Sequence, residues 1–235
     1  MKKSNFLEGA FIATFAIIFT KILGVIYVIP FYSLIGEQGG ALYGYSYTIY
    51  NFFLSISTIG FPLAISKLTS EYNTLNLQNE KIRLYSISKK CILCFSFICF
   101  LVCFIFSPQI ANLIIGNIEN GNTLEDVSFT IKMVSFALLL VPLLSITRGY
   151  LQGHKYMKEP SLSQVIEQVV RVGVILGGSY LTIKVFNLSL KTTVGIAVFA
   201  SAVGALFAYL YLIRTLSKNK DSLNPKEINE SNITY

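Results

Sequence analysis

The sequence predicts an all-α integral membrane protein with six transmembrane helices. Of its 235 residues, 53% are hydrophobic and 13% are charged, whereas a soluble domain carries about 25% charged residues. Six apolar stretches reach the roughly 20 residues that a helix needs to cross a bilayer. Their approximate bounds are 9–35, 41–67, 88–115, 129–150, 162–184 and 191–215. Residues 1–216 therefore form one six-helix unit, and 217–235 form a polar cytoplasmic tail that we expect to be disordered.

The first stretch follows Lys2 and Lys3, as a signal peptide would. It is too long for a signal sequence and lacks a small-residue cleavage site, so we expect a helix that stays in place. Lys21 lies roughly 18 Å into this helix, near the bilayer midplane. A charge there is costly, so we expect Lys21 to line a cavity; a structural pair or a snorkelling side chain is the alternative. Pro30 predicts a kink and a hinge.

The second stretch carries a polar stripe on an otherwise apolar helix. Spacings of three and four residues place its members on one face, and they are Tyr43, Tyr47, Asn51, Ser55 and Thr58. The stripe either lines an aqueous path, with Tyr47 and Asn51 as cavity residues, or bonds to a neighbouring helix. Gly60 and Pro62 predict a break, which we interpret as a second hinge.

The third stretch holds all four cysteines, Cys91, Cys94, Cys99 and Cys103. A zinc or redox site would need further ligands, and the chain's one histidine, His154, lies in a distant loop. Cysteine is a common apolar filler of buried helices. We therefore predict a structural role for these residues and no metal or cofactor.

The fifth stretch opens with Gln164, Glu167, Gln168 and Arg171, whose spacing places them on one face. Glu167 and Arg171 are four residues apart and can pair within the helix. The face is either a neutralised structural pair or the charged lining of a cavity at its cytoplasmic mouth.

Small residues predict packing faces on the last two helices. Gly173 and Gly177 form a GxxxG pair on the fifth stretch. The sixth stretch carries two similar sets, which are Ala197, Ser201 and Ala205, and Ala200, Gly204 and Ala208.

The positive charges predict the orientation, because cytoplasmic loops are rich in Lys and Arg. One side holds Lys2, Lys3, Lys67, Lys81, Arg83, Lys89, Lys90, Arg148, Lys155, Lys158, Arg214, Lys218, Lys220 and Lys226. The other side holds Lys132, Lys184 and Lys191, with Glu119, Glu125 and Asp126 in one loop. Both termini are therefore expected in the cytoplasm, as six crossings require. The formal charge of +7 is an orientation signal and does not indicate a nucleic-acid partner.

Three stretches resemble the polysaccharide-transporter branch of the MOP exporter superfamily, and most closely its stage V sporulation protein B-like family of lipid II flippases. They are KILG at 21–24 followed by Ile29-Pro30 and Gly36, the tyrosine-rich 43–50 followed by IGFPLAISK at 59–67, and RGYLQG at 148–153 followed by Met157, Pro160, SQVIEQ at 163–168 and Arg171.

The resemblance implies one lobe of a MOP/MATE-like two-lobed transporter in a bacterial cell membrane. Such a carrier moves an undecaprenyl-diphosphate sugar between leaflets, and its cationic cavity binds the diphosphate. Lys21 and Arg171 match basic positions of the family's first-helix and fifth-helix motifs. A central cation suits a diphosphate, because charge pairing is strong in a low dielectric.

The chain departs from this family in length, since members have two six-helix lobes and about twice as many residues. Six crossings would relate two lobes by an axis along the membrane normal. A homodimer, a separate second chain and an inactive gene fragment are all compatible with the sequence, and we expect a fragment or split gene more than a homodimer.

Three other functions compete with the flippase. A cation-coupled drug or small-molecule exporter of the same superfamily would use acidic residues, for which Glu8 and Glu167 are the candidates. A membrane enzyme such as a polyprenyl-sugar transferase would need a catalytic loop. Glu159 and His154 lie in one, but 152–160 is short for a nucleotide-sugar site, so we predict no enzyme. The third competing function is that of an assembly subunit that does not transport a substrate.

Overall fold

The structure is a computed structural model that describes residues 5–58, 60–116, 121–219 and 223. In that part of the chain, eight α-helices and one π-helical turn follow one another along the sequence. Their bounds are α1 (Phe6–Ile26), α2 (Val28–Thr58), α3 (Phe61–Thr74), α4 (Gln78–Ile105), α5 (Ser107–Ile115), α6 (Leu124–Gly153), α7 (Lys158–Tyr180), η1 (Leu181–Val185) and α8 (Leu190–Lys218).

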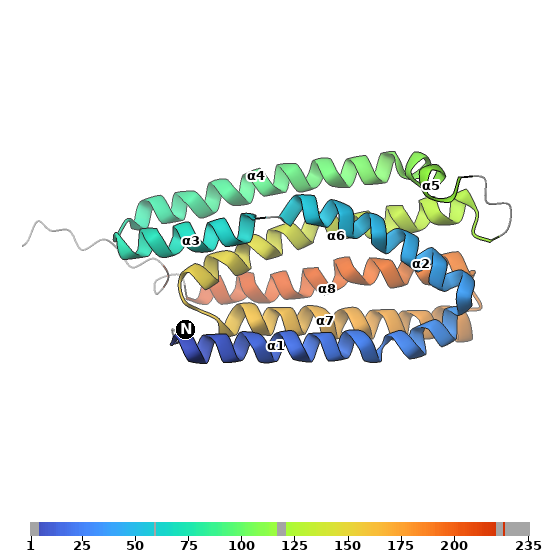
Figure 1. The fold of residues 1–235 in the computed structure, drawn as a ribbon, viewed down its shortest axis with the longest axis horizontal. Helices are drawn as coiled ribbons and strands as arrows, with labels where there is room; N and C mark the ends of the chain where they lie inside the picture. The colour runs from blue at the N-terminus through green and yellow to red at the C-terminus, as the bar shows by residue number, and fades with distance from the viewer. Residues whose placement is uncertain (1–4, 59, 117–120, 220–222, 224–235) are drawn as a thin grey trace, which may run out of the picture.

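Among the described residues, six helical segments are long and apolar enough to cross a membrane, which confirms the predicted all-α membrane fold. The long helices lie side by side along one common direction (Figure 1). The start of α1 and the end of α8 lie at the same end of the bundle, which we call the N-terminal end. The helix at the centre is α6, which packs against α2, α3, α4, α5 and α8.

The first predicted span is built from two helices. It comprises α1 and the first turns of α2, with an interruption at Tyr27, three residues before Pro30. Proline has no N–H to donate to the preceding turn, which explains a break at this place. The chain reverses at Gly36, whose φ of 66° favours glycine. In the gap at 36–40 between the first two predicted stretches, only Gly36 is therefore non-helical.

The second predicted break lies where the sequence places it. Helix α2 ends at Thr58, and Gly60 adopts a left-handed conformation with a φ of 77° before α3 begins at Phe61. Pro62 occupies the first turn of α3, where a missing N–H costs no helical hydrogen bond.

Several helices extend further than their apolar stretches. Helix α3 runs to Thr74 and α4 begins at Gln78, so the gap between the predicted stretches 41–67 and 88–115 contains a loop of only 75–77. Helix α6 runs to Gly153 and α7 begins at Lys158, so the gap between the predicted stretches 129–150 and 162–184 contains a loop of only 154–157. Apolar residues mark where the membrane ends, but a helix can continue into water with polar residues.

Two close approaches by glycine hold α3 against α6. A Cβ on Gly149 would lie 2.4 Å from the Pro62 carbonyl oxygen, and one on Gly153 would lie 2.5 Å from the Ser66 carbonyl oxygen. Real Cβ atoms do not come this close to backbone, so only glycine lets these helices meet as they do.

Of the packing faces predicted on the last two helices, those of α8 are buried and that of α7 is not. The small residues of α8 (Ala197, Ala200, Ser201, Gly204, Ala205 and Ala208) are all buried, as expected. The GxxxG prediction on α7 is wrong for the described chain. A Cβ added to Gly173 or Gly177 would meet no atom within 4 Å, and both glycines are exposed. Spacing alone does not show which side of a helix faces its neighbours.

The prediction of a disordered tail falls mostly outside the described residues. Leu223 is described, and it is buried beside Leu151, Tyr156 and Leu212. Its carbonyl oxygen accepts a 2.8 Å hydrogen bond from the buried Lys81 ammonium. Here the polar tail therefore contributes one apolar side chain to the end of the bundle.

Candidate functional site

Helix α7 presents one polar face toward α1 and α6. Gln164, Glu167, Gln168 and Arg171 recur at intervals of three and four residues, as the sequence predicts for one face. Together with Thr20 and Lys21 of α1 and Arg148 of α6, they line a cavity of about 310 Å³, which we call the cationic cavity. The structure thus brings together five of the residues singled out in the sequence, Lys21, Gln164, Glu167, Gln168 and Arg171.

An ionic triad forms one wall of the cationic cavity. The Glu167 carboxylate accepts a 2.9 Å hydrogen bond from Nη2 of Arg148 and a second, shorter one from Nη2 of Arg171. The three side chains are only 10–20% exposed. The predicted pair within α7 is therefore present, and it is part of a larger group that joins two helices.

Charge counting assigned Arg148 to a cytoplasmic loop, which is wrong. Arg148 lies inside α6, and its Nε donates a 2.8 Å hydrogen bond to the Ser163 hydroxyl of α7. The signal for its role was the RGYLQG stretch, whose first residue it is. Arg148 already lies within the predicted stretch 129–150, but the stretch does not show that its side chain meets Ser163 and Glu167 of α7.

The triad does not use all the donors of Arg171. Its Nε is buried and meets no hydrogen-bond acceptor among the described residues. A buried donor without a partner costs about 1–3 kcal/mol, more when it belongs to a charged group. The cavity therefore holds a donor suited to an anionic ligand.

The formal charge of the cationic cavity is +2, from Lys21, Arg148 and Arg171 against Glu167. Arg171 is about 14 Å beyond the start of its apolar stretch at 162, and Lys21 is about 18 Å beyond the start of its stretch at 9. Both therefore lie well inside a hydrocarbon core that is about 30 Å thick. Cations at this depth usually face a water-filled space or a partner.

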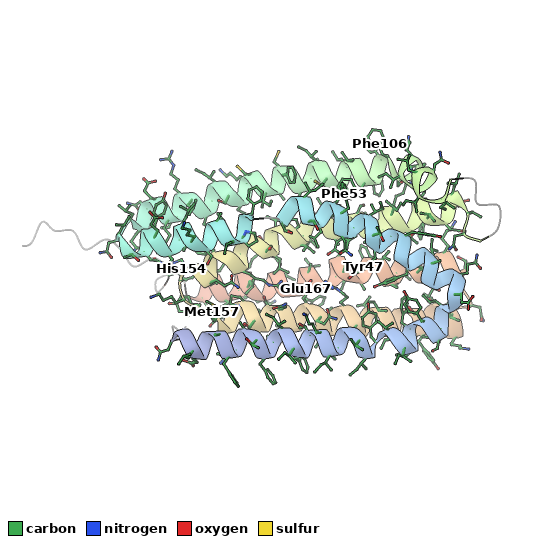
Figure 2. All side chains as sticks on the ribbon, viewed as in Figure 1. Tyr47, Phe53, Phe106, His154, Met157 and Glu167 are labelled. Carbon is green, nitrogen blue, oxygen red and sulfur yellow. The ribbon has the colours of Figure 1, made fainter. Side chains whose placement is uncertain are left out.

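A tyrosine cluster continues from the cationic cavity along α2. The Tyr27 and Tyr43 hydroxyl oxygens are 3.3 Å apart, and the Tyr43 and Tyr47 rings stack with centroids 5.2 Å apart. Figure 2 shows Glu167 and Tyr47 in the middle part of the bundle, with Tyr47 further from the N-terminal end. Tyr47 does not line the cationic cavity, and Asn51 is exposed and also lies outside its lining.

Two glycines bring the walls of the cavity together. A Cβ on Gly204 of α8 would lie 2.6 Å from the Glu167 carbonyl oxygen, so α8 contacts the backbone of α7 directly behind the triad. A Cβ on Gly24 of α1 would lie 3.5 Å from the Gln168 side-chain nitrogen, an ordinary contact. The carboxylate that holds both arginines is thus positioned by close helix packing.

The remaining candidates lie apart from this cavity. Cys91 and Cys94 are exposed on α4, Cys99 and Cys103 are buried, and no disulfide joins any of these four described residues. The His154 ring is buried, with Nδ1 2.9 Å from the Tyr150 carbonyl oxygen. Among the described residues, no three His, Cys, Asp or Glu side chains gather as a metal site would require.

Comparison with known proteins gives one consistent result. A family model described as polysaccharide biosynthesis protein matches residues 6–232. The chain is 38% identical over 221 residues to the lipid II flippase MurJ of Bacillus subtilis (strain 168), covering 94% of this chain and 41% of that protein. It is 26% identical over 212 residues to stage V sporulation protein B of the same organism, covering 90% of this chain and 39% of that protein.

Solved structures show the same architecture. An inward-facing multidrug resistance MATE family transporter of the MOP superfamily superimposes with a TM-score of 0.71 at 17% identity, covering 86% of this chain and 46% of the transporter. This similarity shows the fold, and the matched part is less than half of the transporter, as expected for one lobe. The chain spans about two fifths of the length of the curated relatives it matches.

Proposed function

This chain belongs to the polysaccharide biosynthesis protein family, and from that premise we propose that it is one lobe of a carrier for a lipid-linked saccharide. The substrate class is an undecaprenyl-diphosphate sugar or related cell-wall precursor, moved across the cytoplasmic membrane. The flippase and transporter relatives support this reading over a membrane enzyme. In this proposal both termini face the cytoplasm, since most of the Lys and Arg residues fall in segments that the sequence assigns to the side of the N-terminus.

The observation that carries the proposal is the cationic cavity deep in the bundle. Its formal charge of +2 matches the two charges of a diphosphate diester. Hydrogen bonds between guanidinium and phosphate are short and charge-assisted, and they strengthen where water is excluded. The Nε of Arg171 offers such a donor. A bound diphosphate would thus stabilise cations that an empty bilayer disfavours.

The charged and amide residues of the cavity have distinct proposed roles. Lys21 and Arg171 contact the diphosphate from α1 and α7, and the Gln164 and Gln168 amides hydrogen-bond its oxygens or the first sugar. Glu167 is a positioning residue, because its carboxylate is held by Arg148 and Arg171 and fixes where both guanidinium groups point.

The hinges predicted at Pro30, Gly60 and Pro62 fit a carrier that alternates its access. The helices are interrupted at Tyr27 after α1 and at Gly60 after α2. We propose that these positions absorb the backbone rotation of alternating access.

A second six-helix lobe would complete the carrier. The cationic cavity is walled here by α1, α6 and α7 of a single lobe, and transporters of two repeats bind substrate where the repeats meet. We propose that a second lobe, from a separate chain or from the remainder of a longer protein, supplies the opposite wall. A second copy of this lobe is the geometric alternative.

The cation-coupled exporter fits the structure less well. Such a carrier needs a carboxylate free to bind a cation or a proton, and Glu167 is engaged by two arginines. Glu8 is exposed near the start of α1. Neither carboxylate is presented as a coupling site.

The test is export of a lipid-linked saccharide by the chain together with its second lobe in proteoliposomes. Lys21→Gln and Arg171→Gln should each lower the export rate at least tenfold, whereas Lys67→Gln, which removes an exposed cation outside the cavity, should leave it unchanged. Wild-type export rates in both cavity variants would overturn the proposal.

A further inference from the structure

A second cavity lies on the opposite side of α6 from the cationic cavity. It has a volume of about 270 Å³ and is formed by α4, α6, α8 and Leu223. Arg148 and Tyr150 are two positions apart on α6, so they project to nearly opposite sides of the helix. Arg148 lines the cationic cavity and Tyr150 lines this one, which we call the lipid groove.

The lipid groove lies where three apolar helix segments end. Lys89 is at the start of the apolar part of α4, Tyr150 ends that of α6, and Ile213 is near the end of that of α8. This level of a membrane protein meets the lipid headgroups. Ile82 and Ile213 on its rim are 42% and 38% exposed, so the groove opens outward, where membrane lipid would surround the bundle.

The walls of the groove combine apolar side chains with one cation. Ile82, Ile213 and Leu216 are apolar, and the Tyr85 and Tyr150 rings stack with centroids 4.2 Å apart. The Lys89 ammonium lies 5.6 Å from the centroid of the Tyr209 ring. Among the described residues, no carboxylate pairs with Lys89.

We propose that the lipid groove binds an anionic phospholipid, with its phosphate at Lys89 and the upper part of an acyl chain along Ile82, Ile213 and Leu216. A cation beside apolar walls at headgroup depth matches a phosphate joined to a hydrocarbon chain. Arg83, Lys90 and Arg214 are exposed at the same end and raise the local positive potential. The groove has one lining cation and apolar walls, which suits a headgroup phosphate better than a diphosphate sugar.

The absence of tryptophan from the sequence allows a direct measurement. Ile213→Trp places a single fluorophore at the rim of the groove, and Phe97→Trp places one on the exposed surface of α4 away from it. The purified full chain is reconstituted in mixtures of brominated phosphatidylglycerol and phosphatidylcholine. Quenching then gives the relative affinity for the two lipids at each position.

For Ile213→Trp we expect the relative affinity to favour phosphatidylglycerol about fivefold, the effect of one basic residue at an anionic lipid. Adding Lys89→Gln should bring the ratio of phosphatidylglycerol affinity to phosphatidylcholine affinity close to one, and Lys89→Arg should restore the preference for phosphatidylglycerol. Lys90→Gln removes the neighbouring exposed charge and should leave the ratio above threefold, as a matched control. The Phe97→Trp reporter should show a ratio near one.

Three results would overturn the proposal. One is a ratio near one for Ile213→Trp with Lys89 intact. Another is an equal loss in the Lys89→Gln and Lys90→Gln variants, which would indicate a diffuse surface potential without a site. The third is loss of the phosphatidylglycerol preference when inorganic phosphate is added at constant ionic strength, which would assign Lys89 to a free phosphate ion.

Discussion

The Arg148 guanidinium in α6 lies 2.9 Å from the Glu167 carboxylate in α7, and Glu167 also binds Arg171 one turn further along its own helix. One carboxylate therefore fixes two cations inside a membrane-spanning bundle. This arrangement links the stability of the lobe to the geometry of its cationic cavity.

Glu167→Gln should destabilise the lobe, because it leaves two guanidinium groups with no carboxylate to share. We expect the free energy of unfolding to fall by about 2 kcal/mol, since hydrogen bonds to charged groups contribute about 1.5–3 kcal/mol. The measurement is the melting temperature of the purified chain in detergent. Glu71→Gln, which changes an exposed carboxylate of α3, is the matched control and should melt like the wild type. Equal melting of all three proteins would contradict the triad's structural role.

Arg171→Lys should retain part of the ligand affinity that Arg171→Gln removes. Lysine keeps the positive charge but lacks the planar guanidinium group of arginine. In Arg171 that group binds Glu167 through Nη2 and keeps its Nε available for a ligand. We expect the affinity for a diphosphate lipid to fall about fivefold in Arg171→Lys and at least tenfold in Arg171→Gln. Binding isotherms in nanodiscs measure this order, and an Arg171→Lys variant that binds as weakly as Arg171→Gln would show that charge alone is insufficient.

Gly149→Ala and Gly173→Ala should change stability in opposite directions. A methyl group on Gly149 would meet the Pro62 carbonyl oxygen at 2.4 Å, so this substitution should destabilise the lobe by about 1–3 kcal/mol. A methyl group on Gly173 meets nothing within 4 Å, and alanine should stabilise its helix by about 0.5–1 kcal/mol. Thermal unfolding of the two variants side by side tests the packing of α3 on α6. The same sign for both would argue against it.

Gly60→Ala should destabilise the break between α2 and α3 through its backbone alone. Gly60 has a φ of 77°, and an added Cβ would meet no atom within 4 Å. The left-handed conformation costs a non-glycine residue about 1–2 kcal/mol. Gly44→Ala, in the interior of α2 with equally open space, serves as the control and should be neutral or stabilising. If both variants unfold at the same temperature, the left-handed turn is not required.

The sequence predicts the parts of the site that depend on a single helix. Four polar residues of α7 share a face because of their spacing, and Glu167 and Arg171 pair because they are one turn apart. The depth of Lys21 follows from the length of the first apolar stretch. These inferences need no knowledge of how the helices pack.

The parts that depend on packing between helices were not predictable in the same way. Arg148 lies within the predicted stretch 129–150, but only the packing of α6 against α7 brings its guanidinium to Glu167. The close fit of α3 against Gly149 and Gly153 of α6 was likewise not visible in the sequence. The GxxxG pair of α7 faces outward although its spacing equals that of a packing motif. Periodicity defines a face, and only the fold decides what that face meets.

The central claim is that the cationic cavity binds a lipid diphosphate. The most direct measurement is the affinity of the full chain in nanodiscs for an undecaprenyl-diphosphate saccharide. It is compared among wild type, Lys21→Gln, Arg171→Gln, the double variant that carries both of these substitutions, and the exposed control Lys67→Gln. We expect each cavity variant to bind at least tenfold more weakly, the double variant about a hundredfold more weakly, and the control like the wild type. Equal affinity in all these proteins would contradict the claim and place the substrate elsewhere.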